Sequence, residues 1–335
     1  MDSLSQLALG AAVGIAVMGR RTALWKAALW GGVCGTLPDL DAFIDHGDAI
    51  ADMTLHRANS HALFWLTLAA PAIAALIHRI HGEPGLFRRW WLAVWLALIT
   101  HPLLDLMTVY GTQIARPFTS EPYGVGSVFI IDPLYTLPLL VGVGVALAAT
   151  PARGLRWNAA GLALSTAYLA WGVVAQQQVG AVAREALAAQ GIETRALLVT
   201  PTPFNSVLWR VLAITPQGYV EGYRSLLDDG RGIVFDRFER GEALIATHGE
   251  RDAVKRIAAF THGFYSLAER DGRLLLTDLR MGQEPSYFFR FVVAEQRGDT
   301  WTEVPAFTVG IRPDVDRTLP WLWRRLLGEP LPPPR

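Results

Sequence analysis

The sequence predicts a membrane-embedded bundle of about six helices, followed by a small soluble α+β domain with an antiparallel sheet. Two observations support this fold class. Nearly all long uncharged runs lie in the first 175 residues, and the remainder alternates strand-like runs with turn dipeptides. We therefore expect a membrane helical domain over residues 1–175 that carries a metal site, and an extracytoplasmic α+β domain over residues 176–335.

Apolar runs define the helices of the first half. A membrane-spanning helix needs about 20 apolar residues. The segments that meet this length are 62–80, 90–109, 133–150 and 155–175. Two earlier segments, 4–18 and 23–37, are shorter and rich in glycine and alanine. We expect them to be short or tilted spans, or a helical hairpin buried among the other helices.

The charges between the apolar segments alternate and predict the topology. Three connections are basic and contain Arg20, Arg21, Lys26, Arg79, Arg88, Arg89, Arg153 and Arg156. The positive-inside rule places these connections in the cytoplasm. The loop 38–61 instead holds five aspartates against Arg57 alone, and 108–132 is mildly acidic. Six crossings then put both acidic loops and the chain after residue 176 on the outer side.

The second half has the patterns of an α+β domain. Strand-like runs include "RALLVTP", "VLWRVLAIT" and "GYVEGYRSLL", and "PQG" joins the last two as a hairpin. "GERDAVKRIAAFTH" predicts an amphipathic helix, Asp271-Gly272 predicts a tight hairpin turn, and "SYFFRFVVAEQ" predicts a further strand. The final "LPWLWRRLLGEPLPPPR" either rests on a membrane surface or forms a frayed tail.

Composition excludes two classes of site. Lys+Arg and Asp+Glu are equal at 30 each, which gives no support for nucleic-acid binding. Cys34 is the sole cysteine, so the chain can form neither an intramolecular disulfide nor a thiolate cluster. A metal site must therefore use His, Asp or Glu.

Four polar motifs fall on the outer face of the predicted bundle. They are "LPDLD" (37–41), "HRANSH" (56–61), "THPLLD" (100–105) and "IIDPLY" (130–135). The motifs come from separate parts of the chain, but the topology gathers them at one depth. Ionisable residues at membrane depth usually face the bundle interior and serve a function.

The spacing within the motifs suggests cation ligands, and each motif also has a simpler interpretation. His101 and Asp105 lie four apart, on one helix face, where they can bind one cation or each other. His56 and His61 bracket a helix start with Asn59 or Ser60 as its N-cap; the alternative is a loop with two solvated histidines. Asp39 and Asp41 could equally serve to cap the preceding helix.

These residues predict a divalent metal centre that can activate water. We expect Asp41, His56, His61, His101 and Asp105 as metal ligands and Asp39 as a ligand or its hydrogen-bonding partner. Zinc suits histidine and aspartate, with manganese or magnesium as alternatives. Asp39 or Asp132 would take a proton from the attacking water, and Arg57 would neutralise an anionic group.

The depth of the site favours a lipid or lipid-linked substrate. Two other functions are open at this stage. One is a non-enzymatic scaffold in which a metal or a His–Asp network holds the bundle together. The other is a transporter that uses the polar cluster as an ion site, although this would need polar residues continuing towards the cytoplasmic face.

The order of motifs resembles the predicted membrane-bound metal-dependent hydrolases of the YdjM/YfhP type. The matching pieces include "MDSLSQLALGAAVG", "GTLPDLD", "HRANSH", "THPLLDLMTVYGTQ", "FIIDPLYTLPLL" and "TDLRMGQEPSYFFRF". The resemblance covers most of the chain and implies a multi-pass protein of the cell inner membrane.

That family is distantly similar to zinc-dependent phospholipase C and the S1/P1-type nucleases. The similarity implies phosphoester hydrolysis, with Asp41, His56 or His61, and His101 with Asp105 around one metal. Many relatives carry His or Glu on the first helix, near Gln6 or Ile15 of this chain. The resemblance therefore does not extend to a multi-metal centre, and it leaves the activity of this member open.

Overall fold

The computed structural model describes residues 1–230, 232–311 and 314–335, and they form two compact units. The helical unit comprises residues 1–44, 56–173 and 203–205. The α+β unit comprises residues 45–55, 174–202 and 206–335. The division after residue 173 lies close to the predicted domain boundary, but the segment 45–55 joins the second unit, which the sequence did not predict.

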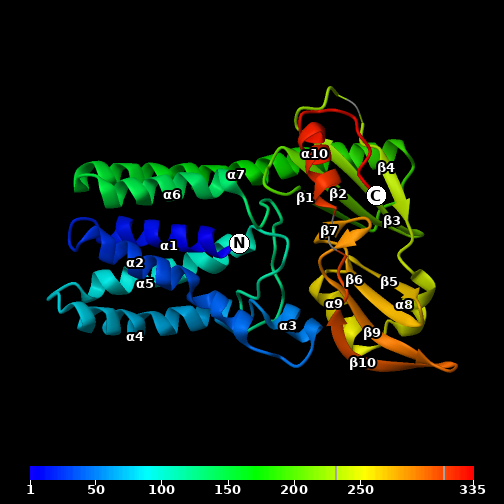
Figure 1. The fold of residues 1–335 in the computed structure, drawn as a ribbon, viewed down its shortest axis with the longest axis horizontal. Coiled ribbons are helices and arrows are strands. Elements are labelled where there is room, and N and C mark those ends of the chain that lie inside the picture. The colour runs from blue at the N-terminus through cyan, green and yellow to red at the C-terminus, as the bar shows by residue number, and fades with distance from the viewer. Residues whose placement is uncertain (231, 312–313) are drawn as a thin grey trace. The chain divides into compact units, whose positions relative to one another are not determined.

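All six apolar segments of the first half are helices (Figure 1). They are α1 (Ser3–Met18), α2 (Leu24–Thr36), α4 (Leu63–His81), α5 (Phe87–Leu106), α6 (Pro133–Ala148) and α7 (Pro151–Ala189). Of these, α4 and α7 are long and apolar enough to cross a membrane, and α1 and α6 are shorter apolar helices. The helices are thus as predicted, whereas six membrane crossings remain a prediction.

Glycines bring α1 and α2 into backbone contact. A Cβ atom added to Gly31 would lie 2.2 Å from the Gly10 carbonyl oxygen, and one added to Gly14 would lie 2.3 Å from that of Ala27. Only residues without a Cβ permit this approach, which is how small residues drive helix packing in membranes. The close pairing places Gly35, at the end of α2, beside Gln6 of α1.

The polar motifs occupy irregular segments at the helix ends. "LPDLDAF" forms the 3-10 helix η1 (Leu37–Phe43), and η2 (Asn59–His61) precedes α4. The predicted N-cap of α4 was wrong, because Ala62 occupies that position without a side-chain bond. The backbone N–H of Leu63 instead donates to the Ile114 carbonyl at 3.0 Å, so a distant loop satisfies the helix start.

The α+β unit contains two antiparallel four-stranded sheets. The first has the order β1 (Ala196–Pro201), β2 (Leu208–Thr215), β3 (Gly218–Ser225), β4 (Phe235–Phe238). The second has the order β10 (Thr300–Thr308), β9 (Arg290–Arg297), β6 (Arg273–Asp278), β5 (Tyr265–Arg270). The predicted hairpins are β2–β3 and β5–β6, and Asp271 and Gly272 take positive φ at the second turn, as a tight hairpin requires.

The predicted strand "SYFFRFVVAEQ" is divided. Ser286–Tyr287 forms β8, which pairs with β7 (Gly282–Gln283), and β9 begins only at Arg290. The predicted amphipathic helix is α9 (Asp252–Phe260), with Val254, Ile257 and Phe260 buried. It follows α8 (Glu242–His248), and α3 (Ala49–Leu55), which comes from the N-terminal half, packs on α9 and β10.

Helices also cover the first sheet. The C-terminal part of α7 contributes Ala175, Val179 and Ala183 to a core that includes Trp209 of β2. The C-terminal segment forms α10 (Val315–Leu326), whose Trp321 packs with Leu208 and Tyr223. The chain end is therefore a docked helix, not a frayed tail.

Candidate metal centre

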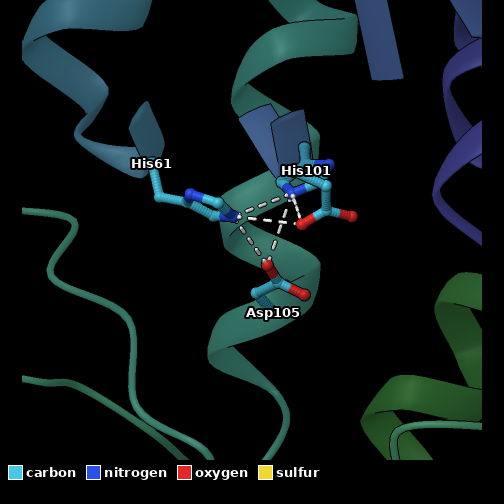
Figure 2. A group of neighbouring side chains, drawn as sticks. His61, His101 and Asp105 are labelled. Atoms are coloured by element: carbon cyan, nitrogen blue, oxygen red, sulfur yellow. Dashed lines mark hydrogen bonds and ion pairs between the residues drawn. The ribbon is translucent and has the colours of Figure 1, made fainter. Parts of the chain in front are cut away.

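Four side chains converge at the ends of α2, α4 and α5. Asp39, His61, His101 and Asp105 each offer one ligand atom, and these atoms all lie within 4.8 Å of one another. His61, His101 and Asp105 are fully buried, whereas the Asp39 side chain is 20% exposed. Figure 2 shows His61 and Asp105 directed towards His101, with ion pairs among them.

His101 presents an electron pair to the cluster. Its Nδ1 lies 2.6 Å from the carbonyl oxygen of Gly35, which can only accept a hydrogen bond. Nδ1 therefore carries the proton, and Nε2 is left with a lone pair. The glycine packing of α1 on α2 fixes the carbonyl that sets this tautomer.

His61 is oriented in the same way by Ser60. The Ser60 hydroxyl donates its proton to Asp41 Oδ2, so its oxygen accepts from Nδ1 of His61 at 2.9 Å. Nε2 of His61 then also has a lone pair and lies 3.1 Å from Nε2 of His101. Two lone pairs at this distance repel each other unless a cation or a proton lies between them.

Asp105 completes the cluster with one of its two oxygens. Oδ1 accepts from the Met1 amino group, from Gln6 Nε2 at 3.1 Å and from Arg57 Nη2 at 3.3 Å. Oδ2 is buried without a hydrogen bond within the described structure and lies 3.3 Å from His61 Nε2 and 3.4 Å from His101 Nε2. A buried carboxylate oxygen without a donor is costly, and a bound cation would remove that cost.

The spacing of the donor atoms fits a small divalent cation. Tetrahedral coordination at about 2.0–2.1 Å requires neighbouring ligand atoms about 3.3–3.4 Å apart. Five ligand pairs are 3.1–3.5 Å apart here, including Asp39 Oδ1 with His61 at 3.5 Å and His101 at 3.3 Å. The residues present therefore fit the predicted metal.

The charges around the cluster also favour a cation. Burial raises the pKa of Asp39, but the adjacent imidazoles of His101 and His61 outweigh it and hold that pKa well below its usual range. Burial lowers the pKa of His61, but the carboxylates of Asp105, Asp39 and Asp41 outweigh it and raise the pKa to about 9. Without a metal, the cluster thus retains a proton that a metal would displace.

Two predicted ligands, Asp41 and His56, lie behind the cluster. Asp41 accepts from His56 Nδ1 at 2.8 Å, from the Arg57 N–H at 3.0 Å and from Ser60. It lies 3.5 Å from Nδ1 of His61, on the ring edge opposite the cluster. The structure thus brings Asp39 to the ligand atoms and uses Asp41 to orient His56 and His61. Direct ligation by Asp41 or His56 remains a prediction.

Arg57 is buried against the cluster. Its guanidinium lies 3.3 Å from Asp105 Oδ1 and from Thr108 Oγ1, and 4.8 Å above the Tyr110 ring. Its Nε–H is buried without a hydrogen-bond partner in the described residues. The backbone of Arg57 has φ of 62°, a region that non-glycine residues seldom adopt and that often marks functional segments.

Asp132, the remaining predicted catalytic residue, is the N-cap of α6. Its Oδ1 accepts from the Leu134 N–H at 3.0 Å, and its Oδ2 accepts from the Tyr168 hydroxyl at 2.8 Å. Oδ1 therefore caps α6, and Oδ2 links α6 to α7. Its role as a proton acceptor remains a prediction.

The first helix contributes Gln6, which the sequence pattern did not assign to the site. Gln6 is fully buried and donates to the His101 carbonyl and to Asp105. Ile15, the other position considered on this helix, lies in the apolar core with Met18 and Trp90. An amide side chain within the apolar run 4–18 was the sequence signal that could have assigned Gln6 to the site.

The sequence model of the YdjM inner membrane protein family matches residues 1–179, more than half of the chain. The chain belongs to this family. The match covers the whole cluster, so the candidate metal centre lies within the YdjM part, and the chain is an inner membrane protein. The chain is also 25% identical over 250 residues to the uncharacterized protein YfhP of Bacillus subtilis (strain 168), covering 72% of each. No solved structure matches it.

Proposed function

We propose that this YdjM family member is a membrane-bound metal-dependent hydrolase with one divalent cation at the outer end of the helical unit. One observation carries the proposal. Two imidazole nitrogens and two carboxylate oxygens converge without a donor between them, at the spacing of a metal coordination shell. Ion pairs that only stabilise a fold alternate in charge, whereas here two lone pairs face each other.

Zinc is the metal that this donor set favours. Zinc accepts mixed nitrogen and oxygen ligands in tetrahedral sites. Magnesium and manganese prefer more oxygen ligands in an octahedral arrangement. Both imidazoles also donate their Nδ1–H to an oxygen, which is the usual support of a metal-binding histidine.

We infer the role of each side chain in hydrolysis from its position and exposure. A bound metal would lower the pKa of water to near neutrality and polarise the bond under attack. Asp39 is the most exposed carboxylate of the cluster and takes the proton of the attacking water. The water oxygen bonds to phosphorus or to the acyl carbon, and the leaving alcohol departs with that proton. Arg57 supplies its Nε–H, which has no partner among the described residues, to the anionic group of the substrate.

The surroundings of Asp39 favour a lipid or lipid-linked substrate. On the same 3-10 segment, Leu40 is 54% and Phe43 is 87% exposed, and the neighbouring Ile44 is also exposed. Apolar side chains that point outward at a membrane surface meet acyl chains, not water. A substrate that carries an acyl chain could therefore approach Asp39 without leaving the lipid phase.

The charge pattern supports a multi-pass topology with the metal centre and the α+β unit on the extracytoplasmic side. A reporter that is active only in the cytoplasm should be silent when fused after residue 200. Activity at that position would place the α+β unit inside the cell and overturn this part of the proposal.

A metal-stabilised scaffold is the second candidate. It is favoured by the number of protein donors, because four already complete a tetrahedral shell, as in structural zinc sites. A catalytic site keeps one position for water, which here would require Asp39 to leave the shell or the shell to expand.

Metal analysis combined with turnover separates these functions. The purified protein should hold one cation per chain, and His101→Ala with Asp105→Ala should lose it, whereas His46→Ala, outside the cluster, should retain it. Equal metal in all variants would refute the site. Asp39→Asn should retain some metal and lose hydrolysis of phospholipids and lipid phosphates. A metal-loaded protein that hydrolyses neither these nor generic phosphoesters would indicate the scaffold.

A further inference from the structure

An apolar stripe on α10 faces away from the sheet that holds this helix. The stripe consists of Val315, Leu319, Trp323 and Leu327, which are 55%, 48%, 64% and 51% exposed. These residues are four apart, so they form one continuous row along the helix. Leu227 is also exposed, and its carbonyl lies against Gly328 at the end of the row.

The stripe belongs to a docked helix, because hydrogen bonds hold the opposite face of α10 to the α+β unit. Arg325 donates to both oxygens of Asp228 at 2.6 and 2.8 Å and to the Tyr223 carbonyl at 2.9 Å. Ser225 Oγ donates to the Leu326 carbonyl at 2.6 Å. Successive residues turn by about 100°, which puts Trp323 on the side opposite Trp321 and Arg325. The outer stripe therefore cannot be buried by a simple rotation of the helix.

The chemistry of the stripe matches the interfacial region of a bilayer. Trp prefers the boundary between headgroups and acyl chains, and a short helix lies in that plane when leucines share its face. Asp314 and Asp316 keep the first turn towards water, and Arg324 beside Trp323 is exposed and pairs with Glu329. In an inner membrane protein the chain itself tethers the α+β unit to the bilayer, so a modest affinity suffices.

We propose that the Leu319–Trp323–Leu327 row of α10 rests in the interfacial region of the bilayer, so that the α+β unit has its own membrane contact besides the helices. The contact is independent of the metal centre. It uses the apolar sequence at the chain end that the hydrolase proposal leaves without a role.

Spin labels on the full chain in lipid nanodiscs test the contact. The native Cys34 is buried and is first replaced by alanine. Nitroxide labels are then attached at single cysteines that replace Leu319, Trp323, Arg324 or Lys255. Positions 319 and 323 should collide with oxygen severalfold more, relative to a water-soluble nickel chelate, than positions 324 and 255. The same label at 324 shows whether the label itself drives insertion.

Two results would overturn the proposal. Free access of the nickel chelate to position 323 would show that the stripe faces water. Shielding of position 323 from both oxygen and nickel would show that protein covers it. Labels at 319 and 323 that report lipid in nanodiscs of phosphatidylcholine alone would further show that apolar burial is sufficient, without anionic lipid.

Discussion

Replacing Asp41 by asparagine tests whether this residue orients the metal site or binds the metal. The substitution keeps the shape of the side chain and removes its charge. Asp41 accepts from His56, Arg57 and Ser60. Its link to His61 passes through Ser60, because its direct distance to Nδ1 of His61 is 3.5 Å. The variant should therefore weaken the hold on His61 without removing a ligand atom.

The expected loss follows from that geometry. Removing an outer hydrogen-bonding partner of a metal ligand typically costs about 10–100-fold in affinity, or about 1.4–2.7 kcal/mol. The indirect contact through Ser60 places Asp41→Asn near the lower end of this range. Asp105→Asn, by contrast, alters the oxygen that faces both histidines and should lose far more.

Competition with a chromophoric chelator in detergent solution measures both affinities. Asp45→Asn is the matched control, because Asp45 is an exposed aspartate of the adjacent segment whose carboxylate bonds the Gly47 N–H. If Asp41→Asn loses metal as completely as Asp105→Asn, Asp41 is a ligand and the arrangement described here is incorrect. An affinity equal to that of Asp45→Asn would show that Asp41 does not orient the site.

Three further predictions concern pH, packing and docking. Because the pKa of His61 is raised to about 9, protons compete with the cation below that pH, and metal affinity should fall by about tenfold for each unit by which the pH is lowered. Metal titrations in non-coordinating buffers that show no pH dependence would contradict this. Gly31→Ala puts a Cβ 2.2 Å from the Gly10 carbonyl oxygen and should destabilise the helical unit by about 1–3 kcal/mol in thermal denaturation. The control Gly144→Ala should not, because a Cβ at that position has no atom within 4 Å. Arg325→Met leaves Asp228 without its main partner, which should destabilise the docking of α10 by about 3–5 kcal/mol. Limited proteolysis should then cleave the C-terminal segment faster than in the control variant Arg324→Met. Equal cleavage rates would refute the role of this ion pair.

The sequence was sufficient to locate the helices of the first half, because they depend on local apolar patterns. The apolar runs mark α1, α2 and α4 to α7, and the His-x3-Asp spacing puts His101 and Asp105 on one face of α5. The composition also changes near residue 176, close to the division between the two units after residue 173.

The roles of neighbouring residues were not accessible from the sequence. Asp39 and Asp41 lie two residues apart on a 3-10 helix, where each residue turns by about 120°, so they point in different directions. Residues two apart also diverge on an α-helix, so the local pattern does not reveal which of the two aspartates faces His61 and His101. Similarly, Leu63 finds its hydrogen-bond partner at Ile114, fifty-one residues away, so no capping side chain was needed.

The passage of residues 45–55 into the α+β unit has a consequence for how this protein can be divided or recombined. This segment lies between Asp41 and His56, which hold each other, and it contains α3, which packs on α9 and β10. Truncation near residue 175 would leave α3 without its packing surface. It would thereby loosen the segments on either side of α3, which carry Asp41 and His56. Chimeras between family members should therefore exchange α3 together with the C-terminal half, and the two halves should be inherited as a single evolutionary unit.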